Sequence, residues 1–279
     1  MKRLLLLILL IAGMAQLPGL QAQQLKVISL NIHNNISPKD DGKYTWNARQ
    51  KAVIKMIESE NPDIIGVQDA LLDQLAYIDK LYRDKYRRVG IGADNGITRG
   101  EHTAIYYDKT KIELASPSKT RWLSTTPQTV SLGWDARNYH IVTIAHFRVK
   151  ATGDEFYYFN THLASERTLA HNESIKLIAK FVSSIVPSGA PVIIGGDMNS
   201  EINNYDFRPL YDLSMDPARD IAYRTDYRNS YNGFGKGTPA MTDHFLVRNV
   251  IVNRFKTLIK NFGIDYISDH YPIMMIITL

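Results

Sequence analysis

One short stretch of the 279-residue chain sets the frame for its fold: Val192-Ile193-Ile194-Gly195-Gly196-Asp197-Met198-Asn199. The apolar run from Pro191 to Ile194 predicts a buried strand, and the two glycines let the backbone turn at its end. Asp197 and Asn199 then follow at the carboxyl edge of the strand, where α/β sheets often place their sites. An aspartate there can bind a hard cation or accept a proton, and an asparagine can donate to an oxyanion. A plain turn is the alternative, because these residue types are common in turns.

Predicted strands alternate with helices on both sides of this stretch. Apolar and β-branched runs predict strands over residues 24–31, 64–68, 102–107, 111–114, 140–149, 155–162, 244–247, 251–259 and 272–278. Apolar residues near helical spacing predict helices over residues 46–60, 71–82 and 169–185. Residues 122–134 and the long polar stretch 200–242 show neither pattern. Since hairpin turns and helical crossovers both occur, we expect an α/β fold with mixed sheets.

The first 22 residues have the pattern of a secretory signal peptide. Lys2 and Arg3 precede an apolar run from Leu4 to Ala12 that is too short to span a bilayer, and small residues lie near Ala22. We therefore expect cleavage near Ala22 and export to the periplasm or the medium, with an uncleaved anchor helix as the alternative. The sequence contains no cysteine, which excludes a lipid anchor through cysteine, disulfides and thiol chemistry.

The rest of the chain has the composition of one globular domain. Hydrophobic residues make up 44% and charged residues 22%, without a linker or repeat, so we expect residues 23–279 to form a single domain. Loss of residues 1–22 removes Lys2, Arg3 and no acid, so the formal charge becomes +5 − 2 = +3. This charge is too small to indicate nucleic-acid binding by itself. We expect a monomer that does not insert stably into a membrane after signal removal.

Polar residues stand at the ends of several predicted strands: Asn31, Asp69, His162, Asp197 with Asn199, Asp243, and Asp269 with His270. Phosphate ester hydrolysis needs neutralised phosphoryl oxygens, an activated water and a stabilised leaving oxygen. A cation held by Asp69, with help from Asn31 and Asp269, would meet the first need. Oxygen ligands without cysteine favour Mg²⁺, Mn²⁺ or Ca²⁺. His162 or His270 suits proton transfer or phosphate contact, because histidine titrates near neutral pH.

These segments, in this order, resemble the endonuclease/exonuclease/phosphatase family. The likeness begins near Lys26 and runs to the C-terminus. Its motifs are Ser29-Leu30-Asn31-Ile32, Gly66-Val67-Gln68-Asp69, Gly100-Glu101-His102, Asn160-Thr161-His162-Leu163, Gly195-Gly196-Asp197-Met198-Asn199, Thr242-Asp243-His244 and Ser268-Asp269-His270-Tyr271-Pro272. The resemblance implies a deoxyribonuclease I-like α/β fold, in which two packed mixed β-sheets are flanked by helices.

The resemblance also implies a metal side and a water side of the site. Asn31 and Asp69 match the metal-site positions of the family, and Asp269 matches a second carboxylate on the metal side. Asp197 and Asn199 match the pair that positions or activates the attacking water and holds the phosphate.

Four further residues match the proton-transfer part of the family's site. His162 and His270 match its two histidines. Asp243 matches the carboxylate that orients one histidine, and Glu101 resembles the carboxylate that supports the other.

At three places the chain departs from the family pattern. Asp69 stands where most members have glutamate, and because its side chain is one methylene shorter, the cation must shift or bind through a water. Ala164-Ser165 stand where an acidic residue often follows the Asn-Thr-His-Leu motif. Asn138-Tyr139 stand where an arginine is common, with Arg137 slightly earlier. We expect weaker metal binding and altered substrate recognition.

Each of these residues also has a purely structural interpretation. Asp69 suits the N-cap of the following helix, and Asp243 suits a surface turn. Glu101 could be an ordinary charge at a strand edge. His162 could be a structural histidine, and Asp269-His270 could form a turn before a proline.

We therefore expect an exported, divalent-metal-dependent phosphoesterase acting on a phosphodiester or a small phosphorylated substrate. The alternatives on the same fold are a phosphomonoesterase, a nuclease, and a non-catalytic binding protein whose metal site is weakened by Asp69. A lipid phosphodiesterase would need an apolar surface loop, which the sequence does not show beyond the signal segment.

The remaining histidines and four aromatic residues are not assigned to the expected catalytic or metal positions. The histidines placed outside the expected site are His33, His102, His140, His146, His171 and His244. The aromatic residues Trp122, Trp134, Tyr231 and Phe234 are expected either to line a pocket or to pack loops against the core, with packing preferred.

Overall fold

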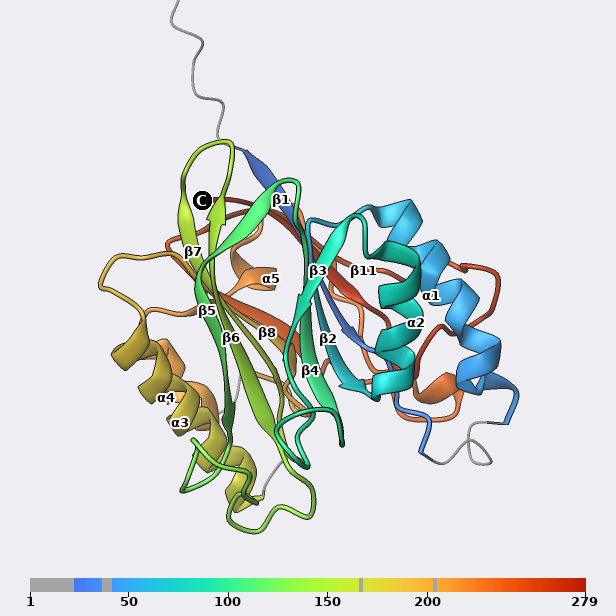
Figure 1. Cartoon of the computed structure of the whole chain (residues 1–279), viewed down its shortest axis with the longest axis horizontal. Coiled ribbons are helices and arrows are strands. Elements are labelled where there is room, and N and C mark those ends of the chain that lie inside the picture. The colour runs from blue at the N-terminus through green and yellow to red at the C-terminus, as the bar shows by residue number, and fades with distance from the viewer. Residues whose placement is uncertain (1–22, 37–41, 166–167, 203–204) are drawn as a thin grey trace, which may run out of the picture.

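The computed structural model describes residues 23–36, 42–165, 168–202 and 205–279, so the expected signal peptide at residues 1–22 lies outside the described part. Two six-stranded sheets face each other in the middle of the molecule, and helices cover both outer surfaces (Figure 1). This is the expected fold of two packed mixed sheets flanked by helices. Within the described residues, no helix combines the length and apolarity needed to cross a bilayer.

The first sheet holds both ends of the described chain. Its strands, in spatial order, are β11 (Ile251–Thr257), β12 (Ile273–Thr278), β1 (Gln24–Asn31), β2 (Ile64–Ala70), β4 (His102–Asp108) and β3 (Tyr86–Val89). β1 and β2 are parallel, with Asn31 opposite Gln68 at their carboxyl ends. The other pairs are antiparallel. β1 and β2 are almost entirely buried, as expected for strands covered on both faces.

The second sheet repeats this plan. Its strands, in spatial order, are β5 (Ile112–Trp122), β6 (Ile141–Val149), β7 (Glu155–His162), β8 (Val192–Asp197), β10 (Asp243–Arg248) and β9 (Asp216–Pro217). The parallel pair here is β7 with β8, and its last register position joins His162 to Asp197. β10 runs antiparallel to β8, so that its first residue, Asp243, lies opposite Asp197. The register of three strands therefore brings three polar residues to one edge.

The helices bury one apolar face each against a sheet. α1 (Trp46–Glu60) and α2 (Leu72–Tyr82) cover the first sheet, and α3 (Leu169–Ile185) with the short α4 (Arg208–Tyr211) covers the second (Figure 1). In α3, Ile175, Ile178 and Val182 recur at helical spacing and are buried. Burying one such side chain stabilises the fold by roughly 1.5–3 kcal/mol.

A third apolar layer lies between the two sheets. Val27 of the first sheet and Phe147 and Phe245 of the second belong to one buried cluster. The remaining elements are the short helix α5 (Ala218–Ile221) and three 3₁₀ turns, η1 (Gly42–Tyr44), η2 (Tyr205–Phe207) and η3 (Gly233–Gly235).

The fold differs from the sequence-based expectation in its short and edge elements. β3 was not predicted, because its two central residues are arginines and its ordering depends on pairing with β4. β5 extends to Trp122 rather than ending at residue 114, since register shifts near Ser116 keep it paired with β6. The polar stretch 200–242 contains α4, α5 and β9, which are too short to show a period.

Candidate active site

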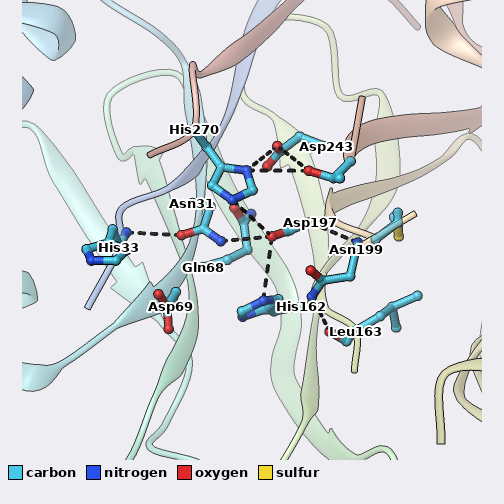
Figure 2. A network of polar contacts seen from close by, with 12 residues as sticks. Asn31, His33, Gln68, Asp69, His162, Leu163, Asp197, Asn199, Asp243 and His270 are labelled. Carbon is cyan, nitrogen blue, oxygen red and sulfur yellow. Dashed lines mark hydrogen bonds and ion pairs between the residues drawn. The ribbon is translucent and has the colours of Figure 1, made fainter. Parts of the chain in front are cut away.

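The candidate site lies where the parallel pairs of both sheets end. A Cβ atom at Gly196, whose φ is +142°, would overlap the carbonyl oxygen of Thr161 on β7. Glycine therefore lets β8 end tightly against β7 and delivers Asp197 beside His162. Across the sandwich, the side-chain amide of Asn31 donates to Asp197 Oδ2 at 2.9 Å (Figure 2). Residues from both sheets thus meet at one carboxylate, a convergence that the strand-end pattern permitted.

Asp197 is the centre of this network. Its Oδ2 atom lies 3.6 Å from Nε2 of His162 and 3.6 Å from Nε2 of His270 (Figure 2). Its Oδ1 atom accepts the backbone N–H of Asn199 at 2.9 Å. The residue is only 1% exposed. A buried carboxylate fixed by two donors and flanked by two histidines is suited to accepting a proton from a water.

His270 is held by a direct bond to a second carboxylate. Its Nδ1 atom lies 2.7 Å from Asp243 Oδ2, and the backbone N–H of Asp243 donates to Ser230 Oγ at 3.0 Å. Burial by itself lowers the pKa of His270, but the Asp243 and Asp197 carboxylates outweigh it and raise that pKa to about 10. His270 is therefore an imidazolium at neutral pH. Asp243 is 1% exposed, so the surface-turn interpretation of this residue is wrong.

His162 has a looser carboxylate partner. Its Nδ1 atom lies 3.9 Å from Glu101 Oε2, beyond hydrogen-bond reach. Burial and then the neighbouring Asp69 carboxylate raise the pKa of Glu101 to about 7. For His162, burial lowers the pKa, but Asp197, Asp69 and Glu101 together raise it above the ordinary value. The neighbouring carboxylates thus raise the pKa of both site histidines, with a far tighter carboxylate partner at His270.

Asp69 lies beside His162 and Glu101, and these three residues form the second half of the site. It has a left-handed backbone, with φ at +58°, where the register of β2 against β4 shifts. Both carboxylate oxygens accept from Asn34: Oδ2 from the backbone N–H at 3.0 Å and Oδ1 from the side-chain amide at 2.7 Å. The N-cap residue of α2 is Leu71, so the capping interpretation of Asp69 is wrong.

Asp269 and Asn31 both contact His33, a residue that was not expected in the site. His33 Nδ1 lies 3.0 Å from Asp269 Oδ2, and the His33 backbone N–H donates to Asn31 Oδ1 at 3.0 Å. Burial raises the pKa of Asp269, but the bond from His33 and other neighbours bring it below the ordinary value. The signal for His33 was its place two residues beyond Asn31, at the same strand end.

Other neighbours of the site come from loops. His140, also excluded by sequence, places Nδ1 3.0 Å from the carbonyl oxygen of His162, and burial lowers its pKa to about 4. The ring of Tyr231 lies 5.1 Å from that of His270, and Phe234 lies 5.0 Å from the His33 ring. Trp122 instead is buried and donates to a backbone carbonyl, which fits the packing interpretation.

The donor groups present fit a divalent cation. Asp69, Glu101 and His162 each offer one ligand atom, and these three atoms lie within 4.8 Å of one another. Asp197, Asp243 and His270 form a similar group. Carboxylate oxygens with an imidazole nitrogen are usual ligands for such ions. Asn199 is close by, but its side-chain amide donates to the carbonyl oxygen of Leu163 at 2.7 Å.

Proton-transfer groups around one carboxylate, beside a group of cation ligands, are what hydrolysis of a phosphoric ester requires. The sequence model of the Endonuclease/Exonuclease/phosphatase family matches residues 28–270 of this chain. The chain belongs to this family, whose members hydrolyse phosphoric esters.

Similar proteins support this assignment over almost the whole chain. A protein of this family from Bacteroides vulgatus is 28% identical, with a TM-score of 0.85 and coverage of 92% of this chain and 99% of that one. The mannosyl-6-phosphatase of Bacteroides thetaiotaomicron is 26% identical, with a TM-score of 0.84 and coverage of 91% and 100%. An uncharacterised protein of Acanthamoeba polyphaga mimivirus is 26% identical over 269 residues, which cover 90% of this chain and 99% of the viral protein.

Proposed function

We propose that this protein is an exported, divalent-metal-dependent phosphoesterase that hydrolyses a small phosphomonoester. The observation that carries the proposal is the position of Asp197 Oδ2, 3.6 Å from Nε2 of both His162 and His270. Asp197 would accept a proton from the attacking water. His270, kept protonated by Asp243, would contact the phosphoryl group or supply a proton to the leaving oxygen.

A divalent cation, when bound, would neutralise charge on the phosphoryl oxygens. The residues that would hold it are among Asp69, Glu101, Asn31 and Asp269, which offer oxygen ligands at this edge. The mannosyl-6-phosphatase with a similar fold, 26% identical, supports a phosphorylated sugar or a similar small monoester as substrate. The mild net charge, which is +5 for the full chain and +5 − 2 = +3 without residues 1–22, also favours a small substrate over nucleic acid.

The experiment compares esters with one and two organic groups. The purified protein is treated with EDTA, restored with Mg²⁺ or Mn²⁺, and assayed on mannose 6-phosphate, p-nitrophenyl phosphate and bis(p-nitrophenyl) phosphate. We expect metal-dependent phosphate release from the monoesters and little cleavage of the diester. Preferred diester cleavage would overturn the monoester assignment and support a phosphodiesterase. Inactivity on all three with both metals would favour a binding protein.

Export rests on residues 1–22 and has its own test. When the full chain is expressed in a Gram-negative bacterium, we expect the protein in the periplasm or medium, with an N-terminus close to residue 23. Mass spectrometry of the intact protein would show this cleavage. A chain that stays uncleaved in the membrane fraction would instead support an anchor helix.

A further inference from the structure

The half of the site around His162 contains more ligand atoms than its proton transfer uses. Asp69, Glu101 and His162 bring two carboxylates and one imidazole within 4.8 Å of one another. In Figure 2, Asp69 lies on the His162 side of the network, apart from the Asp243–His270 pair. A pair of carboxylates this close repels unless a cation or a proton separates them.

The Nδ1 atom of His162 is the second observation that points to a ligand. This nitrogen is buried from solvent and has no hydrogen-bond partner among the described residues. Glu101 Oε2, the nearest carboxylate oxygen to it, is 3.9 Å away. A divalent first-row ion such as Zn²⁺ binds nitrogen and oxygen atoms at roughly 2.0–2.2 Å, so two ligand atoms of one ion lie up to about 4.4 Å apart. The separation is thus too long for a hydrogen bond and suitable for a shared ion.

A small space exists beside these atoms. A cavity of about 10 Å³ is lined by Asp69, Glu101 and His162, together with neighbouring residues of β4 and β6. A volume of roughly 10–15 Å³ accommodates one water-sized particle. The cavity therefore has room for one ion or one water, and not for a substrate.

Asp69 is turned toward this space by its local structure. The residue has a left-handed φ of +58° at the irregular end of β2, and such irregularities commonly redirect a side chain next to a site. Asn34 donates to both of its oxygens and also to Glu101 Oε1, at 3.2 Å. One asparagine thus orients both carboxylates, which is the arrangement of neighbours that fixes metal ligands.

At the two alternative positions for an ion, the histidine Nδ1 atom already has a close carboxylate partner. In the group of Asp197, Asp243 and His270, the Nδ1 atom of His270 contacts Asp243 directly at 2.7 Å. On the other side, His33 contacts both Asp269 and Asn31. The His162 group differs from both, because its Nδ1 atom has no hydrogen-bond partner among the described residues.

We propose that Asp69, Glu101 and the Nδ1 atom of His162 together bind one divalent first-row transition-metal ion such as Mn²⁺. An imidazole ligand favours such an ion over Mg²⁺ and Ca²⁺, which prefer all-oxygen sites. The Nε2 atom of His162 still faces Asp197 in this arrangement. The proposal deepens the proposed function by locating and selecting the ion, and rests on that function only for the use of the ion in hydrolysis.

The test measures binding rather than turnover. Metal-free protein is titrated with Mn²⁺, the free ion is followed by electron paramagnetic resonance, and the bound ion is examined by pulsed methods that detect ¹⁴N ligands. We expect ¹⁴N coupling in the unaltered protein. In His162→Gln this coupling should disappear, and in both His162→Gln and Glu101→Gln the Kd for Mn²⁺ should rise at least about 10-fold. Mg²⁺ should displace bound Mn²⁺ only in large excess.

His270→Gln is the matched control, because its Nδ1 atom contacts Asp243; it should keep both the ¹⁴N coupling and the Mn²⁺ affinity. Circular dichroism checks that each variant is folded. Absence of Mn²⁺ binding at millimolar concentration would show that the cavity holds water, and would overturn the proposal. Binding without ¹⁴N coupling, or coupling that persists in His162→Gln, would overturn it equally. Monoester hydrolysis together with an all-oxygen Mn²⁺ site would support the proposed function and overturn the metal-site proposal. A nitrogen-bound ion without hydrolysis would support the metal site and overturn the proposed function.

Discussion

The two histidines of the site are placed alike and held differently. His162 and His270 both present Nε2 to the same oxygen of Asp197, each at 3.6 Å. The Nδ1 atom of His270 lies 2.7 Å from a carboxylate oxygen of Asp243, whereas the Nδ1 atom of His162 lies 3.9 Å from one of Glu101. A short bond between charged groups fixes both the ring and its proton. The longer separation leaves a buried nitrogen without a hydrogen-bond partner among the described residues, so similar histidine–carboxylate pairs can serve a proton in one half and a cation in the other.

The largest effect is expected where the two halves meet. Asp197→Asn keeps the shape of the side chain but removes the charge between the histidines and the base for the water. We expect kcat to fall by about 10³-fold or more, with thermal unfolding changed little. Steady-state kinetics and a melting curve measure the two effects. A loss below about 10-fold would show that Asp197 is not the central group.

A smaller effect should distinguish the His270 half of the site from the His162 half through the pH dependence of kcat. The pKa of His270 is about 10 because Asp243 and Asp197 outweigh its burial. In Asp243→Asn that pKa falls, so the protonated form needed for activity is lost at a lower pH. We expect kcat at pH 8 to fall about 100-fold, with the basic limb of the kcat profile moved to lower pH.

Glu101→Gln at saturating Mn²⁺ is the counterpart of Asp243→Asn. Because Glu101 Oε2 lies 3.9 Å from its histidine, the basic limb should stay near that of the unaltered protein. The measurement is kcat from pH 5 to pH 10 for all three proteins. Equal shifts in both variants would mean that the two halves work alike.

A still smaller effect should come from the residue that orients the second half. Asn34 donates to Asp69 and to Glu101, and its replacement by alanine leaves both carboxylates without that support. We expect Mn²⁺ affinity to fall about 10-fold, with kcat at saturating Mn²⁺ within about threefold of the unaltered value. Calorimetry gives the affinity. An unchanged affinity would mean that the carboxylates hold their positions without Asn34.

The smallest effect concerns the histidine that follows Asp243 in the chain. His244 Nε2 donates to the carbonyl oxygens of Ser200 and Met241, and burial lowers its pKa to about 4. The unfolded chain binds this proton near pH 6.5 and the folded chain near pH 4, so stability is lost as the pH falls through this window. At pH 5.5 the loss is about 1 kcal/mol.

His244→Gln should remove that part of the pH dependence. Urea unfolding at pH 7.5 and pH 5.5 gives the difference in free energy of unfolding for both proteins. The basic limb of the activity profile should not move, since the glutamine replaces a neutral ring. An identical loss of stability in the variant would assign the acid sensitivity to another group.

The sequence predicted the long elements well. The helices at 46–60 and 169–185 and the strands at 24–31 and 155–162 have the bounds that their apolar pattern indicated. These elements are long enough for a period to show, and each buries a continuous face. β3 and the second part of β5 were missed because polar edge strands are ordered by their partners.

For the site, the sequence indicated which residues approach one another but not their contacts. The strand ends at Asn31, His162 and Asp197 meet, which the strand-end pattern permitted and the structure shows. His33 was excluded, although it contacts Asp269, because a histidine in a polar loop has no periodic signal. The predicted metal set joined Asp69 to Asn31 and Asp269 and stays a prediction, and the structure adds Glu101 and His162 as possible ligands close to Asp69.

The sequence alone determined the alternating strands and helices and the strand ends at which the site forms, and the resemblance to the family implied the two packed sheets. Apolar periodicity and a glycine at position 196 act over a few residues, so their structural consequences are local and can be predicted from a single sequence. Only the tertiary structure decided how each histidine is held. The difference between 2.7 Å at His270 and 3.9 Å at His162 arises from packing between strands of both sheets and a loop, far apart in sequence. Interactions of charges depend steeply on such distances and on burial, and no local pattern encodes them.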